Sequence, residues 1–477
     1  MAAIPIVRLN EGAQSALGLS QLVHALNCTK QLGGYEHLAN RVYKPWADRG
    51  QILETQAAVA TLVASWQTSG ASLHAIMDRV AKAMSNLKSV ADRYDPPKSA
   101  LVQATENFLE ISMEAAVLLG ALLAGNVQTG VLANIVDLLA LRKTPMLAGF
   151  LKAVTAEGIT FDFRTQGTST VSSQTVTPSP QVKRNWNDPS NALLANFLWT
   201  DPQYLNLKAQ LDQVKQCWAE LDYLVCLAHA AVKYQLVCPE IVDRAIYDVS
   251  GGKHPLLWMW HLDPSKKPYH VNATPAPCIN SISLERGPSR RNTMIITGPN
   301  SGGKTSLMQQ VGLSVVMALM GGFVPAEVDT LPKIGIFDAI ETLFGSSGRL
   351  GEGGTHAMEV RAVGEVYGRT TDRTLLLVDE PYRSTDPDSG RALTHATIAA
   401  MGERAGLVMM ATNQIDRLAT VAAANPFMTL AHMGHSINGS GDPVPSFLLR
   451  PGVTTLRHYG IAEAKRVGLH PDIAGRV

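Results

Sequence analysis

A glycine-rich segment at 298–306 carries the residue types that hold a nucleotide phosphate. Its pattern Gly-x-x-x-x-Gly-Lys-Thr is that of a phosphate loop, in which glycines let successive backbone N–H groups turn toward phosphate oxygens. Lys304 supplies a mobile cation for the β- and γ-phosphates, and Thr305 supplies a hydroxyl for Mg²⁺. The alternative is a glycine-rich turn that binds no ligand. The residues expected to bind ATP are Gly298, Pro299, Asn300, Ser301, Gly302, Gly303, Lys304, Thr305 and Ser306.

Hydrolysis of a bound nucleotide also needs a second metal ligand and a group that orients the attacking water. The apolar run 375–378 ends at Asp379 and Glu380, so we expect Asp379 to hold Mg²⁺ and Glu380 to polarise the water. Glu380 and Lys304 are therefore the expected catalytic residues. The alternative for the two carboxylates is a structural ion pair at the end of a buried strand.

A third apolar strand, at 407–411, is followed by Thr412 and Asn413. In open α/β sheets ligands bind beyond the carboxyl ends of the strands, so Asn413 is expected to reach the γ-phosphate. The alternative for Asn413 is the N-cap of a helix at 415–421. Between the phosphate loop and the run 375–378, the glycine-rich segment 345–355 is expected to be a nucleotide-sensing loop that acts on a partner's γ-phosphate. The alternative is a disordered surface loop.

The elements that must position these residues change type along the chain. Apolar residues recur at helical spacing from residue 1 to about 155 and again from 204 to 234, which predicts long helices. After 241, strands alternate with helices, which is typical of an α/β domain with a parallel sheet. We therefore predict a multidomain α plus α/β protein, with a helical domain at 1–240 and a P-loop ATPase domain at 241–477. The clearest expected elements are strands at 245–249, 279–284, 294–296, 375–378 and 407–411, and a helix at 307–320.

One stretch of the helical half has a different composition. Residues 165–181 are rich in Ser, Thr, Gln and Pro, so they are expected to form a mobile loop or a thin β excursion. A basic pair and a tryptophan follow at 183–186. Such a group can contact a DNA backbone, but the favoured interpretation is a solvated loop end.

Composition excludes several classes of protein. Lys and Arg number 41 against 40 Asp and Glu, so any surface for nucleic acid must be a local patch. The five cysteines form no Cys-x-x-Cys pair, which favours reduced thiols in an intracellular compartment over a zinc site or a disulfide framework. No signal peptide is visible and the longest apolar runs are short or broken by glycines, so no membrane partner is expected.

These motifs together resemble those of the MutS family of DNA mismatch-repair ATPases. Residues 297–304 are similar to the family's T-G-P-N-x-G-G-K phosphate loop, and residues 379–385 to its D-E-x-x-R-G-T segment. Thr355 and Glu359 fit its S-T-F-x-x-E signature. Residues 252–255 are similar to the G-R-H-P sequence at the entry to the family's ATPase domain. Residues 26–45 are similar to a motif of its core domain, and residues 459–462 and 467–471 to motifs of its terminal helices.

The resemblance implies a fold, an activity and partners. It implies a helical core with lever helices, a reduced DNA clamp near 160–190, and an ABC-type ATPase domain that works as a dimer. In the family ATP lies between two subunits, and the signature loop, here Gly354 and Thr355, faces the other subunit's γ-phosphate. The implied partners are mismatched, branched or duplex DNA and an identical or related MutS-family subunit, in a nucleus, nucleoid or cytoplasm.

Several positions depart from the family pattern. Gly354 stands where the signature serine is expected, Asn413 replaces a histidine, and Ser384 replaces a glycine. The family's N-terminal mismatch-recognition and connector domains are expected to be missing. We expect a slow ATPase that controls DNA clamping in mismatch repair or recombination. The alternatives are a structural partner of a longer MutS homologue with little ATPase activity of its own, and an ABC-type ATPase that acts on another polymer or a transport partner.

Overall fold

The protein forms two compact units in its computed structural model. The first comprises residues 1–27, 39–56 and 230–477, and the second comprises residues 28–38 and 57–229. The predicted clamp region at 160–190 and most of the predicted sensing loop, at 345–353, lie outside the described residues. The predicted functional boundary between residues 240 and 241 stays a prediction. The structure describes residues 5–91, 104, 107–108, 111–112, 115, 205–269, 271, 276–288, 290–344, 354–413, 416–437, 443–453, 468, 470 and 473.

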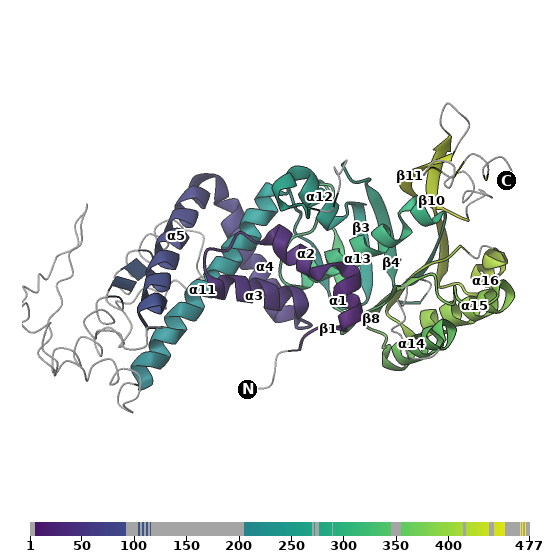
Figure 1. The fold of residues 1–477 in the computed structure, drawn as a ribbon, viewed down its shortest axis with the longest axis horizontal. Helices are drawn as coiled ribbons and strands as arrows, with labels where there is room; N and C mark the ends of the chain where they lie inside the picture. The colour runs from purple at the N-terminus through teal and green to yellow at the C-terminus, as the bar shows by residue number, and fades with distance from the viewer. Residues whose placement is uncertain are drawn as a thin grey trace, which may run out of the picture. The chain divides into compact units, whose positions relative to one another are not determined.

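The first unit is built on a seven-stranded sheet with the order β1-β7-β8-β9-β5-β10-β11. Figure 1 labels β1, β8, β10 and β11 of this sheet. Neighbouring strands are parallel except for the antiparallel pair β10 and β11. Parallel strands covered on both faces need continuous apolar sequence, which explains the apolar runs in β8 and β9. The strands are β1 (Arg8–Leu9), β5 (Thr293–Thr297), β7 (Ala339–Phe344), β8 (Thr374–Asp379), β9 (Leu407–Ala411), β10 (Met428–Ile437) and β11 (Pro443–Pro451).

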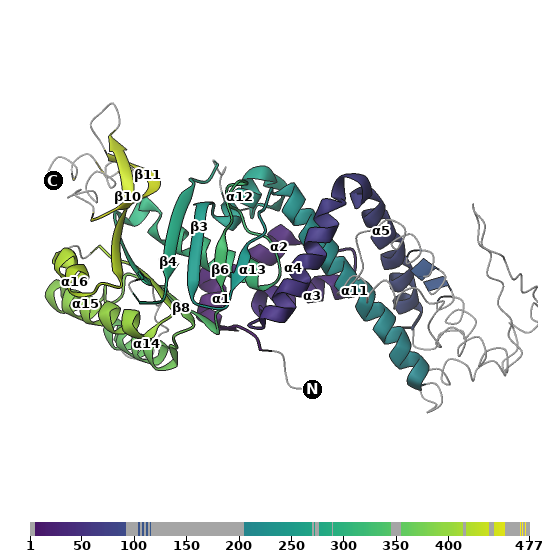
Figure 2. The ribbon, with the colours of Figure 1, turned by 180° about the vertical axis from the view of Figure 1, so that it is seen from behind.

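Helices cover both faces of this sheet, as Figure 2 shows. On one face, Val363 and Ile398 of the helices share a core cluster with Leu376 of β8. On the other face, Gly312 comes close to both Leu17 and Leu377, the next residue of β8. The alternation of Leu376 and Leu377 between the two faces follows from the pleat of the strand. The helices of the first face are α14 (Thr355–Arg369), α15 (Pro387–Arg404) and α16 (Leu418–Ala424), and those of the second are α13 (Lys304–Leu319) and α1 (Glu11–Leu17).

A smaller sheet, two further α-helices and a short 3-10 helix also belong to the first unit. The sheet has the order β2-β6-β3-β4. His254 is the N-cap of α12, where its side chain accepts a hydrogen bond from the Leu257 N–H, and Pro255 takes the first helical position. The elements are β2 (Glu240–Val242), β3 (Ile246–Gly252), β4 (Asn280–Glu285), β6 (Lys333–Gly335), α2 (Leu19–Leu26), α12 (Pro255–Leu262) and the short 3-10 helix η3 (Pro264–Lys266).

The N-terminal segment differs from the helical expectation. Arg8–Leu9 pairs with β7 and adds an edge strand to the large sheet. Glu341 of β7, whose side chain is fully buried, accepts a hydrogen bond of 2.6 Å from Asn10. The same carboxylate forms ion pairs with Arg8 at 3.5 Å and Arg369 at 3.3 Å. A two-residue strand has no sequence period, and its partners are distant in the chain, so local pattern did not predict it.

The described residues of the second unit are mostly helical, as predicted. Asp222, on α11, accepts the backbone N–H groups of Lys30 at 2.8 Å and Gln31 at 2.9 Å, just before α3 begins. Burial raises the pKa of Asp222 to about 6, against the lowering effect of these hydrogen bonds. The long helices that lie wholly or partly in this unit are α3 (Leu32–Tyr43), α4 (Arg49–Ala64), α5 (Trp66–Ala91) and α11 (Leu205–Lys233).

Most elements predicted after residue 204 are present in the structure. The helix predicted at 204–234 is α11, and the strand predicted at 407–411 is β9 with the same bounds. The short helix α12 and the antiparallel strand β11 have no counterpart among the specific predictions. In the part of the chain that the structure describes, no helix has the length and apolar character needed to span a membrane.

Candidate functional site

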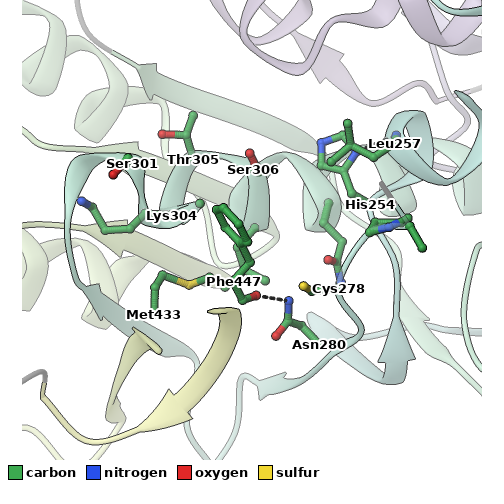
Figure 3. Close-up of a pocket in the computed structure, with 15 residues that line it drawn as sticks. His254, Leu257, Cys278, Asn280, Ser301, Lys304, Thr305, Ser306, Met433 and Phe447 are labelled. Carbon is green, nitrogen blue, oxygen red and sulfur yellow. Dashed lines mark hydrogen bonds between the residues drawn. The ribbon is translucent and has the colours of Figure 1, made fainter. Parts of the chain in front are cut away.

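The phosphate loop connects β5 to α13 (Figure 3). Gly298 and Gly303 have φ angles of 136° and 90°, a region in which a side chain would be strained. A Cβ at Gly298 would also lie 3.2 Å from the Cβ of Met433. Between them, Asn300–Gly302 forms one 3-10 turn, closed by a 2.9 Å hydrogen bond from the Gly302 N–H to the Pro299 carbonyl. The glycines therefore allow the reversal that places the N-terminus of α13 at the loop.

Lys304 begins α13, and its side chain is 3% exposed. Its ammonium group donates to the carbonyl oxygens of Gly298 at 2.7 Å and Pro299 at 3.0 Å, and lies 3.5 Å from the carboxylate of Glu380. Burial lowers the pKa of Lys304, while the nearby Glu380 and Asp379 act in the opposite direction. An ammonium group held by the loop's own carbonyls is placed to exchange those partners for phosphate oxygens, which form stronger, charge-assisted hydrogen bonds.

Asn413 joins the Lys304 ammonium group to the Glu380 carboxylate. Its Oδ1 accepts a hydrogen bond from Lys304 at 3.0 Å, and its Nδ2 donates to Glu380 Oε1 at 2.6 Å. The partners determine the orientation of the amide, because an ammonium group only donates and a carboxylate only accepts. The alternative that Asn413 caps the next helix is wrong, because α16 has Arg417 as its N-cap.

The register of the sheet explains why residues far apart in the sequence meet here. Asp379 of β8 pairs with Ala411 of β9, and Ala411 pairs with Ile296 of β5. All three strands are parallel, so their carboxyl ends lie in one row at the same edge of the sheet. Glu380, Asn413 and the phosphate loop therefore emerge side by side, at the edge where open α/β sheets bind ligands.

Thr305 and Asp379 bring two oxygen groups together beside the loop. The Thr305 hydroxyl donates to Asp379 Oδ2 at 2.5 Å. Among the described residues, no group of three or more His, Cys, Asp or Glu side chains is arranged to hold a metal ion. Mg²⁺ is usually held by one or two protein oxygens together with water and substrate phosphates. The hydroxyl and carboxylate pair therefore fits Mg²⁺ that binds with a nucleotide.

The turn that follows Asp379 has a strained backbone. Glu380 and Tyr382 have φ angles of 49° and 59°, which non-glycine residues rarely adopt. Packing holds the turn, because Tyr382 is buried and its hydroxyl lies 2.9 Å from that of Thr397. The Ser384 hydroxyl donates to Glu359 at 2.5 Å and ties the turn to α14. Such strain is typical of functional sites.

Gly354 and Thr355 lie at the start of α14. Gly354 is the N-cap, with no side-chain hydrogen bond to the helix, and a Cβ there would have no neighbour within 4 Å. Both residues are exposed. In the described chain, neither makes a hydrogen bond or ion pair with the Lys304 group. The structure therefore leaves these two residues accessible and separate from the site that the other predicted residues form.

A cavity of about 580 Å³ adjoins the phosphate loop. Ser301, Thr305 and Ser306 are among its walls at the loop, and residues of α12, α13, β10, β11 and the segment before β4 also line it (Figure 3). Small-molecule sites commonly have volumes of roughly 300–1,000 Å³. Phe447 and Asn280, which line this cavity, were not identified from the sequence, because neither belongs to a motif and the two are distant in the chain.

Comparison with known proteins gives one family. Residues 294–475 match the family model of MutS domain V. The chain is similar to the DNA mismatch repair protein MutS of Chlorobaculum parvum, with 30% identity over 271 residues, 56% of this chain and 29% of the relative. The MutS proteins of Natronomonas pharaonis and Porphyromonas gingivalis show 28% identity over 268 residues and 32% over 191 residues, which cover 29% and 20% of those relatives. The chain thus matches less than a third of the length of these relatives.

Proposed function

Because this chain belongs to the MutS family, we propose that it binds ATP with Mg²⁺, hydrolyses the ATP slowly, and uses the nucleotide state to control its hold on DNA. The arrangement of three residues beside the phosphate loop carries this proposal. The side-chain amide of Asn413 is hydrogen-bonded both to the Lys304 ammonium group and to the Glu380 carboxylate, which lie 3.5 Å from each other. The relatives from Chlorobaculum parvum and Natronomonas pharaonis are named as DNA mismatch repair proteins. A role in mismatch repair or recombination, in an intracellular compartment that holds DNA, is part of the proposal.

The position of each residue suggests its role. Lys304 would exchange the carbonyls of the loop for the β- and γ-phosphates, and backbone N–H groups of the phosphate loop would surround those phosphates. Glu380 would accept a proton from the attacking water, while Asn413 keeps its carboxylate in place and reaches the γ-phosphate. Thr305 and Asp379 would hold Mg²⁺, which when bound neutralises charge on the phosphate oxygens.

A second subunit would complete the site. We propose that Gly354 and Thr355 contact the γ-phosphate of a nucleotide held by an identical or related MutS-family subunit. Their exposure supports this role, and the N-terminus of α14, where the N-cap Gly354 makes no side-chain hydrogen bond, favours a negatively charged ligand. Pairing that depends on nucleotide would then supply the two states that bind DNA differently.

Nucleotide binding and turnover in two variants test the assignment. Lys304→Ala should weaken ATP binding about 10- to 100-fold, the equivalent of charge-assisted hydrogen bonds worth about 1.5–3 kcal/mol. Glu380→Gln should bind ATP normally and lose turnover about 100-fold or more, because the general base is gone. Lys333→Ala, a change of a half-exposed lysine on the small sheet, is the matched control. Unchanged ATP affinity in Lys304→Ala would show that the site is assigned wrongly.

Binding to DNA is tested separately. Filter retention of duplex, mismatched and four-way-junction DNA should depend on whether ATP, ADP or no nucleotide is present. Failure to retain any of the three DNA forms under any of these conditions would exclude the DNA-binding part of the proposal. It would favour an ATPase that acts on a different partner.

A second candidate is a nucleotide-binding structural partner of a longer MutS homologue. The absence of a side chain at Gly354 favours it, because the N-cap then offers only its backbone to a nucleotide of the other subunit. Steady-state ATP turnover distinguishes the candidates. Turnover that Glu380→Gln abolishes would exclude the structural partner, whereas intact ATP binding without turnover would support it.

A further inference from the structure

Cys28 and Cys226 lie 198 positions apart in the sequence and meet within the second unit. The Cys28 N–H donates a hydrogen bond to Cys226 Sγ at 3.4 Å, and the Cys28 thiol donates to the Cys226 carbonyl oxygen at 3.9 Å. A further hydrogen bond joins the two thiols. Both residues are in the thiol form. Each cysteine is therefore the immediate neighbour of the other.

The two cysteines lie where the start of α3 packs closely on α11. A Cβ at Gly33 of α3 would lie 2.8 Å from the Cβ of Ala219 on α11. Asp222, one turn before Cys226 on α11, accepts backbone N–H groups of the segment that follows Cys28. Two successive turns of α11 therefore hold this segment, and every one of these contacts is noncovalent.

The two thiols differ in access and in protonation. Cys28 is half-buried, so a small oxidant can reach it. Cys226 is 1% exposed. The hydrogen bond with the Cys28 thiol and burial both raise the pKa of Cys226 well above its ordinary value, so this thiol keeps its proton. An oxidant therefore meets Cys28 first, with a protonated thiol beside it.

We propose that Cys28 and Cys226 are an oxidation-sensitive pair that a peroxide converts into a disulfide. The Cys28 sulfur attacks the O–O bond of hydrogen peroxide, which leaves a sulfenic acid on Cys28 and releases one water molecule. The Cys226 sulfur then displaces the hydroxyl group from Cys28, and the proton of Cys226 leaves with that group as a second water molecule. Two thiols thus lose two electrons to one peroxide. This inference does not depend on nucleotide binding.

The surrounding structure allows the bond to form and gives it a consequence. The two sulfur atoms must approach to about 2.05 Å. Cys28 is placed to make this movement, because it lies after the end of α2 at Leu26 and before the start of α3 at Leu32. The disulfide would close a loop that spans 198 positions. A cross-link of this kind restricts the unfolded chain, so the oxidised protein should resist unfolding.

Peptide mapping after oxidation tests the pairing. The full chain is treated with hydrogen peroxide, its remaining thiols are alkylated, and it is digested with trypsin without reductant. Trypsin releases Cys28 in the peptide 9–30 but leaves Cys217 and Cys226 together in the peptide 216–233, so the protein used is Cys217→Ser. The two peptides should be cross-linked, and dithiothreitol should separate them. Oxidation of Cys28 to sulfinic or sulfonic acid without the cross-link would overturn the proposal, as would no reaction at either cysteine.

Cys217 also provides the matched control, since it is half-buried on the same helix and makes no hydrogen bond with another cysteine in the described chain. The variant Cys226→Ser, which retains Cys217, should lose the cross-link between the two peptides. A cross-link of equal yield in that variant would show that Cys28 pairs with Cys217 and would refute the assignment.

Urea unfolding followed by circular dichroism tests the consequence. Oxidised Cys217→Ser protein should unfold at a urea concentration about 0.5–1 M higher than the same protein with dithiothreitol. A variant that carries both Cys28→Ser and Cys217→Ser should show no such shift after the same treatment. An unchanged or lower midpoint in protein whose cross-link has been mapped would refute the stabilising effect of the disulfide.

Discussion

The packing of the helix behind the phosphate loop is tested most directly at Gly312. A Cβ added here would lie 2.5 Å from Leu17 Cδ2 and 3.1 Å from Leu377 Cδ1. Carbon atoms in favourable contact are about 3.5–4.0 Å apart, so Gly312→Ala crowds the interface between α1, α13 and β8. Leu17 and Leu377 are both fully buried, so neither side chain can move into solvent.

Two opposing effects determine the expected change in stability. Replacing a helical glycine with alanine stabilises by about 1 kcal/mol, because alanine loses less backbone entropy on folding. Overpacking costs about 1–3 kcal/mol, and an approach of 2.5 Å belongs to the upper part of that range. The net result for Gly312→Ala should be a free energy of unfolding lower by about 1–2 kcal/mol.

Gly364 is the matched control. It is an exposed glycine within α14, and an added Cβ would have no neighbour within 4 Å. Gly364→Ala should therefore stabilise the protein by the propensity gain alone, about 1 kcal/mol. Urea unfolding followed by circular dichroism should show changes of opposite sign in the two variants. Equal stabilisation by Gly312→Ala and Gly364→Ala would refute the packing of α1 against α13.

Three further changes have expected outcomes in the same assay. Glu341→Ala removes a fully buried carboxylate shared by two partly exposed arginines, so the free energy of unfolding should fall by about 2 kcal/mol. Glu365 is exposed, and Glu365→Ala should change the free energy of unfolding by less than about 0.5 kcal/mol. Burial lowers the pKa of His254 to about 4, so its contribution to stability is complete above pH 6.5 and is lost as the pH falls toward 4. His254→Asn retains a capping acceptor and should flatten the dependence of the free energy of unfolding on pH between 6.5 and 4. Burial raises the pKa of Asp222 to about 6, so its contribution to stability is complete below pH 3.8 and is lost as the pH rises through 6. Asp222→Asn should remove this loss of stability. An unchanged pH profile in either variant would contradict the assignment to that residue.

Local pattern was sufficient for the strands and the loop that form the centre of the first unit. The apolar runs at 294–296, 375–378 and 407–411 lie in β5, β8 and β9, because strands buried on both faces need such runs. Glu380 and Asn413, which follow two of these strands, are joined in the structure by a hydrogen bond of 2.6 Å. The roles assigned to these residues in catalysis stay predictions.

What the sequence did not predict depends on contacts between distant segments or on backbone angles. The pairing of Asn280 with Phe447 joins positions 167 residues apart, and no motif marks either one. The left-handed conformation of Phe447 conflicts with the preference of a bulky residue, so local propensity points away from it. The edge strand Arg8–Leu9 is too short to show a period, and only its parallel partner makes it a strand.

The same edge strand has a consequence for how the protein is made. Asn10 and Glu341 are hydrogen-bonded across 331 residues of chain. At about 5–20 residues per second, a ribosome needs about 20–60 s to pass from one to the other. During that interval most of the second unit, residues 57–229, leaves the ribosome, while β1 waits without its partner. We therefore expect a nascent chain in which the described helices of the second unit fold early. The pairing of β1 with β7 forms only near the end of synthesis, and chaperones would protect the unpaired strand in between.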